Sequence, residues 1–304
     1  VLLANCFRRA LRKGGKGSAP GPTGWRYEHL RVVLQSDFAF DHLLGLCQLL
    51  VAGRVPPRVA NLLASASLTP LAKPAGGIRP LAVGEVVRRA TARAVCMQSS
   101  KRFTADLAPH QFAVGFKGGC EVVHKSVQVL LEQHPDFLVV ALDVRNAYNS
   151  ILRGSCLESI CQLRPELAAF AKLFYCRSSH YFYRDARGYS WGISADEGVE
   201  QGDGFAPALF AYGVRRALAN AQCIIDAQCV LLDLPRVHIF AYLDDVVLVR
   251  HRGVADLAFD AIGKSLLELC GLTLNLGKTH VWSPHPERPI GRLADFWHPD
   301  GVVL

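Results

Sequence analysis

Apolar and polar residues follow two kinds of spacing along this chain, and together they predict separate helices and paired strands. Helical spacing covers part of 1–17, 25–66 with a break at two prolines, 84–103, 121–133, 151–175, 205–221 and 254–270. Strand patterns cover 68–73 and 78–81 across a turn at 74–77, then 137–142, 180–193, 237–250 and 272–282. This mixture favours an α+β fold over an alternating parallel sheet.

Two adjacent carboxylates, Asp244 and Asp245, interrupt the apolar stretch 237–250. The pattern predicts a β-hairpin with both residues at its tip. Paired negative charges in a buried sheet need a cation, hydrogen bonds, water or a bound proton. A divalent metal would satisfy them and would point towards phosphoryl transfer. The alternative is a polar turn with no chemical role.

Composition narrows the class of protein. The chain has 304 residues, half of them hydrophobic, which predicts one large domain or two packed lobes. Its net charge of +8 suits a polyanionic partner, although a solvated basic surface is an equal alternative. Many of the basic residues lie near the N-terminus, at Arg8, Arg9, Arg12, Lys13, Lys16, Arg26 and Arg31.

The ten cysteines show no metal-binding spacing, and most have apolar neighbours. We therefore expect buried, reduced thiols in an intracellular reducing compartment. The sequence shows neither a secretory leader nor an apolar run long enough to span a membrane, so no membrane association is expected. Because the chain begins at Val1, we expect it to be a fragment or a processed form.

Asp143 follows the continuous apolar strand 137–142. It could simply cap the next turn. If its strand lies beside the hairpin, however, Asp143 completes a cluster of three carboxylates with Asp244 and Asp245. Such a cluster can hold two Mg²⁺ ions about 4 Å apart, of which one activates an attacking 3′-hydroxyl and the other steadies the leaving pyrophosphate.

Four segments in order resemble the A, B, C and D motifs of reverse transcriptases, and a fifth resembles the fingers hairpin of that family. The motifs are 143–150, 201–210, 242–245 and 271–278, and the hairpin is 68–80. The resemblance covers residues 18–282. Segments 18–25 and 111–124 are similar to non-LTR retrotransposon enzymes, including elements that insert at fixed sites, which makes the nucleus an expected location.

The resemblance implies a right-hand polymerase core with fingers and an antiparallel palm sheet, the thumb being largely absent. It implies an N-terminal arm and fingers at 1–107, a palm with inserted fingers elements at 108–282, and the start of a primer-grip region at 283–304. It also implies that Asp143, Asp244 and Asp245 are catalytic metal ligands for two Mg²⁺ ions, with Mn²⁺ as a substitute.

Tyr148 lies five residues after Asp143. In reverse transcriptases an aromatic residue here lies under the sugar of the incoming nucleotide and rejects a 2′-hydroxyl. RNA-dependent RNA polymerases tend to have a polar residue at this position. Tyr148 therefore favours the first class, although a core aromatic at a strand–helix junction is the alternative.

The resemblance assigns substrate contacts to five further residues. Lys73 and Arg79 would bind the triphosphate, although they also suit a solvated hairpin. Gln201 and Gly202 would position the template–nucleotide pair, and Gly202 would allow close backbone approach; a simple turn before a helix is the alternative. Lys278 would donate a proton to pyrophosphate, or is an ordinary exposed lysine.

The sequence departs from the family pattern at Ala206, where the motif usually has Ser, which removes one potential hydrogen bond. The predicted function is RNA-directed DNA polymerisation for a mobile element, with an RNA template, a DNA or RNA primer and dNTPs as partners. Two alternatives stay open. One is an RNA-dependent RNA polymerase, and the other is an inactive nucleic-acid-binding remnant of a retrotransposon.

Overall fold

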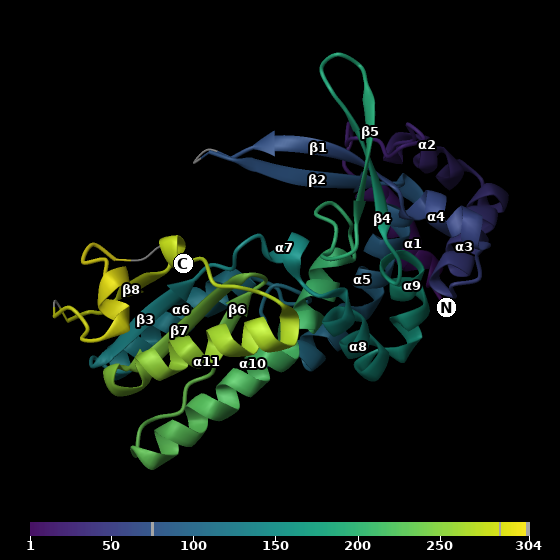
Figure 1. Cartoon of the computed structure of the whole chain (residues 1–304). Helices are drawn as coiled ribbons and strands as arrows, with labels where there is room; N and C mark the ends of the chain where they lie inside the picture. The colour runs from purple at the N-terminus through teal and green to yellow at the C-terminus, as the bar shows by residue number, and fades with distance from the viewer. Residues whose placement is uncertain (74–75, 286, 302–304) are drawn as a thin grey trace. The chain divides into compact units, whose positions relative to one another are not determined.

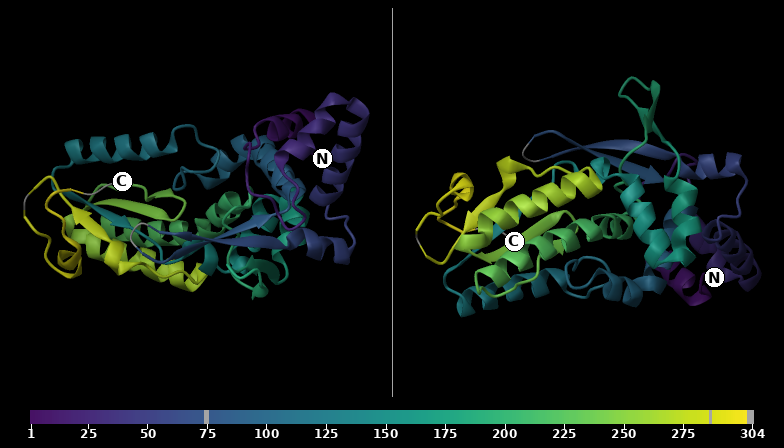
Figure 2. Two further views of the ribbon diagram at one scale, coloured as in Figure 1. Left: turned by 90° about the horizontal axis from the view of Figure 1, so that it is seen from above. Right: turned by 60° about the horizontal axis from the view of Figure 1, so that its bottom comes forward.

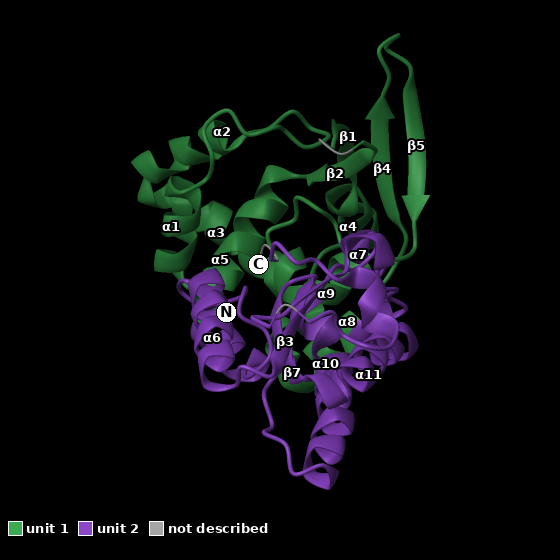
Figure 3. Cartoon of the chain, turned by 90° about the vertical axis from the view of Figure 1, so that its left-hand side faces the viewer, with its two compact units in different colours: residues 1–100, 156–209 green, residues 101–155, 210–304 purple. Residues whose placement is uncertain are grey.

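The computed structural model describes residues 1–73, 76–285 and 287–301, and the chain divides into two compact units (Figure 3). Unit 1 comprises Val1–Ser100 and Cys156–Leu209, and unit 2 comprises Lys101–Ser155 and Phe210–Leu304. Each unit is therefore built from two separate stretches of sequence. The predicted division into arm and fingers, palm and primer-grip region stays a prediction.

Helices supply most of the regular structure (Figure 1). The α-helices are α1 (Ala4–Arg12), α2 (Tyr27–Arg31), α3 (Asp37–Val51), α4 (Pro57–Ala64), α5 (Val86–Leu107), α6 (Gly119–Gln133), α7 (Ala147–Ser150), α8 (Arg153–Leu163), α9 (Pro165–Tyr175), α10 (Ala206–Leu231) and α11 (Arg252–Cys270). Three 3₁₀ turns accompany them: η1 (Val32–Gln35), η2 (Leu276–Lys278) and η3 (Arg292–Phe296). No helix among the described residues is long and apolar enough to cross a membrane.

Unit 1 holds a four-stranded sheet in the order β2-β1-β4-β5. Its strands are β1 (Ala66–Ala72), β2 (Ile78–Gly84), β4 (Ser179–Arg184) and β5 (Ser190–Ala195). The sequence predicts its two hairpins, β1–β2 and β4–β5. It does not predict the short parallel pairing of β1 with β4 that joins them, with Ala66 opposite Tyr181.

Unit 2 holds an antiparallel sheet in the order β6-β7-β3-β8, in agreement with the predicted palm sheet. The strands are β3 (Phe137–Leu142), β6 (Phe240–Tyr242), β7 (Asp245–His251) and β8 (His280–Trp282). β3 is central and almost entirely buried, which explains why its sequence is a continuous apolar run instead of an alternating one. The predicted α+β class is confirmed.

Helices cover both faces of the unit 2 sheet: α6 lies along one face and α11 along the other (Figure 2). Val123 and Val127 of α6 pack into one apolar cluster with Phe137 and Val139 of β3. Because side chains alternate along a strand, the intervening β3 residues face α11. Packing on both faces holds the sheet in place, so the ends of its strands keep fixed positions relative to one another.

Four predicted features need correction. Helix α10 runs ten residues beyond the expected end at 221, because the buried residues Ile225 and Cys229 continue its helical spacing. Strand β6 starts only at Phe240, and the 3₁₀ turn η2 interrupts the segment expected to be extended from 272 to 282. All ten cysteines are free thiols, yet only four are buried, against the expectation that most would be. Those four are Cys47, Cys156, Cys229 and Cys270.

Two predictions extend beyond the described residues. The expected turn 74–77 includes positions 74 and 75, and the expected primer-grip segment 283–304 includes positions 286 and 302–304. These positions lie outside the residues that the structure describes.

Candidate active site

The first carboxylate, Asp143, is held at the end of β3 by the segment that precedes β8. The amide of Asn275 donates to the carbonyl of Asp143 at 2.8 Å, and the amide of Arg145 donates to the carbonyl of Thr273 at 2.9 Å. These main-chain bonds continue the antiparallel pairing for a few residues beyond β3. They fix the position of Asp143 in the fold.

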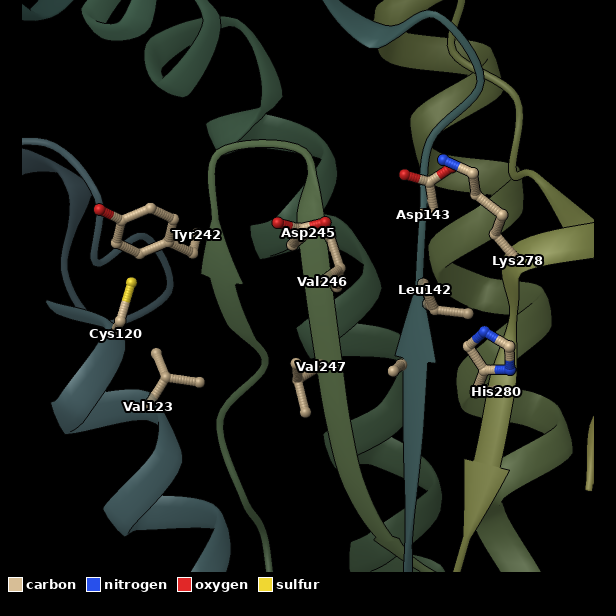
Figure 4. Close-up of a pocket in the computed structure, with 11 residues that line it drawn as sticks. Cys120, Val123, Leu142, Asp143, Tyr242, Asp245, Val246, Val247, Lys278 and His280 are labelled. Carbon is tan, nitrogen blue, oxygen red and sulfur yellow. The ribbon is translucent and has the colours of Figure 1, made fainter. Parts of the chain in front are cut away.

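The side chain of Asp143 has two cationic or polar neighbours at the same oxygen. Asn275 Nδ2 donates to Asp143 Oδ2 at 2.9 Å, and Lys278 Nζ lies 3.3 Å from that atom. Asp143 is 23% exposed and Lys278 is 65% exposed, so solvent screens this ion pair. The predicted site residue Lys278 therefore lies directly beside the first carboxylate, as Figure 4 shows.

Asp244 and Asp245 occupy different positions in their hairpin, which corrects the expectation that both lie at its tip. Tyr242 pairs with Asp245 across β6 and β7, so Leu243 and Asp244 form a two-residue turn and Asp245 is the first residue of β7. A one-residue offset along a strand reverses the direction of a side chain. The two carboxylates thus have different surroundings.

The carboxylates form one electrostatic group. The pKa of Asp245 is raised, first by partial desolvation and then by the negative charges of Asp244 and Asp143, while Lys278 acts in the opposite direction. Figure 4 shows Asp143 and Asp245 at the same end of the neighbouring strands β3 and β7. The fold therefore brings together the three residues that the sequence predicts to be close.

The fit of this group to a divalent cation depends on its charge. Neighbouring carboxylates that repel one another are a donor set that a hard dication would stabilise. Within residues 1–73, 76–285 and 287–301, no three His, Cys, Asp or Glu side chains stand ready to hold a metal ion. The contacts of Asp143 with Lys278 and Asn275 offer a reason, because they turn one ligand oxygen towards protein donors. The assignment of metal ligands stays a prediction.

Tyr148 lies in α7, close to the carboxylates. Its ring stacks on Phe210 at a centroid distance of 4.9 Å and an interplanar angle of 3°. Its pKa is raised, mainly by burial and in addition by the charge of Asp244. The residue is half-buried, so it is a packed aromatic as well as a neighbour of the site. Its predicted contact with a sugar stays a prediction.

A cavity of about 450 Å³ opens beside Asp143 and Asp245. Apolar residues of β3 and β7 line most of it, together with Tyr242, Lys278 and His280. Figure 4 shows Cys120 and Val123 of α6 on its opposite side. The carboxylates thus border space that a substrate could enter.

The remaining predicted site residues belong to unit 1. Lys73 and Arg79 are exposed on the β1–β2 hairpin, where Arg79 pairs with Leu71 and the amide of Lys73 donates to the carbonyl of Gly77. Their predicted contact with a triphosphate stays a prediction.

Gln201 and Gly202 lie in a loop fixed against β2. The amide of Ala82 donates to the carbonyl of Gln201 at 2.9 Å. Gly202 has φ of 118°, and a Cβ placed on it would lie 2.5 Å from the carbonyl oxygen of Ala82. Close backbone approach is therefore required here within the protein itself, a reason for glycine that the sequence alone does not give.

Sequence reasoning missed the buried network that anchors both ends of this loop. The Arg88 guanidinium lies 3.0 Å from Glu200 Oε2 and 2.8 Å from Asp203 Oδ2, and all three side chains are at most 3% exposed. The Tyr175 hydroxyl donates to Asp203 Oδ2 at 2.7 Å. Ala206, at the start of α10, is fully buried. The sequence shows only that charged residues precede α10, and this pattern does not indicate that Glu200 and Asp203 are buried together with Arg88.

The structure groups the predicted residues by unit. Unit 2 brings together the carboxylates, the tyrosine and the lysine, namely Asp143, Tyr148, Asp244, Asp245 and Lys278. Unit 1 carries Lys73, Arg79, Gln201 and Gly202. Asn275 also belongs to the site, and only its place in the fourth motif could have indicated it.

Known proteins resemble this chain in sequence and in fold. No family model matches the sequence. The chain is 26% identical over 278 residues to the retrotransposable element SLACS 132 kDa protein of Trypanosoma brucei gambiense, a match that covers 89% of this chain. It spans only 22% of the length of that protein.

Solved structures of telomerase are similar in fold. Apo telomerase from Candida tropicalis matches with a TM-score of 0.54 at 10% identity, covering 75% of this chain and 46% of that chain. Telomerase from Candida albicans, in complex with a TWJ fragment of telomeric RNA, matches with a TM-score of 0.53 at 14% identity, covering 75% and 44%. The chain therefore shares the fold of these telomerase structures over three quarters of its length, in agreement with the predicted fingers-and-palm core, and is similar in sequence to a retrotransposable-element protein.

Proposed function

We propose that this chain is an RNA-directed DNA polymerase domain, which adds deoxynucleotides to the 3′-end of a DNA or RNA primer along an RNA template. The observation that carries the proposal is the group of carboxylates Asp143, Asp244 and Asp245 at one end of an antiparallel sheet in a polymerase fold. The net charge of +8 suits a nucleic-acid partner.

In this proposal Asp143, Asp244 and Asp245 hold two Mg²⁺ ions, for which Mn²⁺ can substitute. Bound divalent ions lower the pKa of an attacking hydroxyl and neutralise charge on the transferring phosphoryl group. The carboxylates fit this task because desolvation, and then the negative charges of Asp244 and Asp143, raise the pKa of Asp245, so a cation placed among them would be stabilised.

Lys278 has two roles in the proposal. Before substrate binds, it balances the charge of Asp143 at 3.3 Å. Because its side chain is largely exposed and flexible, it can then turn away from Asp143 and give a proton to the leaving pyrophosphate.

Tyr148 sets the sugar preference in the proposal. Stacking on Phe210 holds the ring at a fixed orientation near Asp244. A rigid ring under the nucleotide sugar leaves no room for a 2′-hydroxyl, so deoxynucleotides are favoured.

On unit 1, we assign the exposed cations Lys73 and Arg79 to the triphosphate of the nucleotide. An ammonium and a guanidinium fork both suit phosphate oxygens. We assign the loop at Gln201 and Gly202 to the template–nucleotide pair, because its backbone is fixed by β2 and its ends by the Arg88 network.

Primer extension on an RNA template with Mg²⁺ tests the proposal, with dNTPs and rNTPs offered in separate reactions. The expected result is extension with dNTPs and little with rNTPs. Preference for rNTPs would instead indicate an RNA-dependent RNA polymerase. Salt-sensitive binding of the primer–template without extension would indicate a nucleic-acid-binding remnant.

A further inference from the structure

Gln111 is a buried residue whose side chain holds the turn that carries Asp244. It is 1% exposed and lies beside β6, where it forms a parallel bridge with Ala241. The amide of Leu243 donates to Gln111 Oε1 at 2.7 Å, and Gln111 Nε2 donates to the carbonyl of Leu243 at 3.3 Å. One side-chain amide thus satisfies both main-chain groups of one residue.

The residue held in this way has an unusual backbone. Leu243 has φ of 58°, in the left-handed region, although it is not a glycine. This conformation is unfavourable for a branched side chain and persists only where neighbouring contacts enforce it. A two-residue hairpin turn requires a positive φ, and the bonds from Gln111 supply the enforcement at Leu243. Asp244 and Asp245 follow immediately, so their directions depend on this turn.

We propose that Gln111 is a positioning residue that sets the directions of the Asp244 and Asp245 carboxylates through the backbone of Leu243. Its effect on catalysis rests on the proposed function, whereas its effect on the turn does not. Groups that orient metal-binding side chains act in this indirect way in other proteins. Loss of Gln111 loosens the turn and lowers the fraction of molecules with both carboxylates correctly aimed.

The chain offers a matched control in Gln222 of α10. This buried glutamine also bonds main-chain groups in both directions, donating to the carbonyl of Val237 at 3.0 Å and accepting from the amide of Ile239 at 2.8 Å. It therefore holds the segment that enters β6, at the opposite end of the strand from the carboxylates. Gln111→Met and Gln222→Met each remove one bond to a main-chain amide and one to a main-chain carbonyl, together with one further bond, from Ala113 N to Gln111 Oε1 at 3.3 Å or from Gln222 Nε2 to Asp226 Oδ1 at 2.7 Å.

Hydrogen–deuterium exchange of the peptide 240–246 tests the structural step without any need for activity. In Gln111→Met the Leu243 amide loses its acceptor, and its exchange is expected to be faster by about fivefold or more. Gln222→Met is expected to leave this turn unchanged. Unaltered exchange at the turn in Gln111→Met would overturn the proposal, as would equal acceleration in both variants.

Mn²⁺ binding and single-nucleotide incorporation test the consequence. Gln111→Met is expected to weaken Mn²⁺ binding and lower kcat by about 10- to 100-fold, with little change in KM. Gln111→Glu keeps the acceptor for the Leu243 amide and is expected to be less impaired in kcat. The proposal would be overturned if Gln111→Met bound Mn²⁺ as tightly as Gln222→Met and had the same kcat.

Failure of the proposed function gives a different pattern. If the parent chain neither binds Mn²⁺ nor extends a primer, the polymerase assignment fails. Exchange at the turn then still decides whether Gln111 holds Leu243 in place.

Discussion

Replacement of Arg88 tests whether the buried network holds unit 1 together. Arg88→Met removes the cation that faces Glu200 and Asp203 but keeps an unbranched apolar side chain in the same space. It leaves two carboxylates buried without their guanidinium partner. It also removes the guanidinium from its position 4.3 Å above the Phe174 ring.

The size of the effect follows from burial. Removing one member of a buried ion pair costs about 3–5 kcal/mol, because the remaining charge stays desolvated. Arg88 faces two carboxylates and is fully buried, so we expect the upper part of this range. Natural domains are stable by only about 5–15 kcal/mol, so the variant loses a large share of its free energy of unfolding.

Urea denaturation measures this loss. With a slope of about 2–3 kcal/mol per molar urea, a loss of about 4–5 kcal/mol is expected to lower the midpoint by about 1.3–2.5 M. Arg89→Met is the control, because Arg89 is only partly buried and donates to the Ala19 carbonyl. Its expected loss is about 1 kcal/mol.

A compensated variant separates charge from packing. Combining Arg88→Met with Glu200→Gln and Asp203→Asn removes all three charges, and we expect it to regain at least half of the lost stability. The reasoning is refuted if Arg88→Met costs no more than Arg89→Met. It is also refuted if the neutralised variant is no more stable than Arg88→Met alone.

Three further predictions concern the site. Asp245→Asn should stabilise the cation-free protein near pH 7 but not near pH 3. The pKa of Asp245 is raised above the ordinary 3.8, so the parent loses stability as the pH rises through that window, and the substitution removes this loss. Thermal melts measure the effect, and equal gains at both pH values would contradict it. Tyr148→Ala should raise the use of rNTPs relative to dNTPs by about tenfold in primer extension, and an unchanged ratio would count against a sugar contact. Gly202→Ala should lower the free energy of unfolding by about 1–3 kcal/mol, because the added Cβ clashes with the Ala82 carbonyl. Gly154→Ala is the control, because a Cβ at Gly154 meets open space. Equal effects of the two substitutions in urea denaturation would contradict the close approach.

The sequence was sufficient to predict those elements whose structure is determined by a local pattern of residues. Strand β3 was predicted with its observed ends, because a fully buried strand is a continuous apolar run and Asp143 ends it. The hairpin at Asp244 and its place beside Asp143 followed from the order of the motifs. The antiparallel palm sheet followed in the same way.

The parts of the site and of the fold that the sequence did not predict depend on contacts between residues far apart in the chain. Asn275 bonds Asp143 across 132 positions, and Gln111 bonds Leu243 across the same separation. The fourth motif contains Asn275 but does not indicate which residue it contacts, and no local pattern indicates that Gln111 bonds Leu243. Arg88 has no such signal either, because an arginine in a helix is ordinarily exposed, and only the buried carboxylates of the folded chain explain its burial.

Single-nucleotide incorporation by Asp244→Asn tests the central claim, that the carboxylates of unit 2 carry out nucleotidyl transfer. This substitution keeps the size of the side chain and removes its charge. The control is Asp233→Asn, an exposed position in the loop after α10 with φ of 52°, which asparagine tolerates well. We predict a fall in rate of about 10³-fold for Asp244→Asn and no change for Asp233→Asn. An Asp244→Asn variant as active as the parent chain would contradict the account.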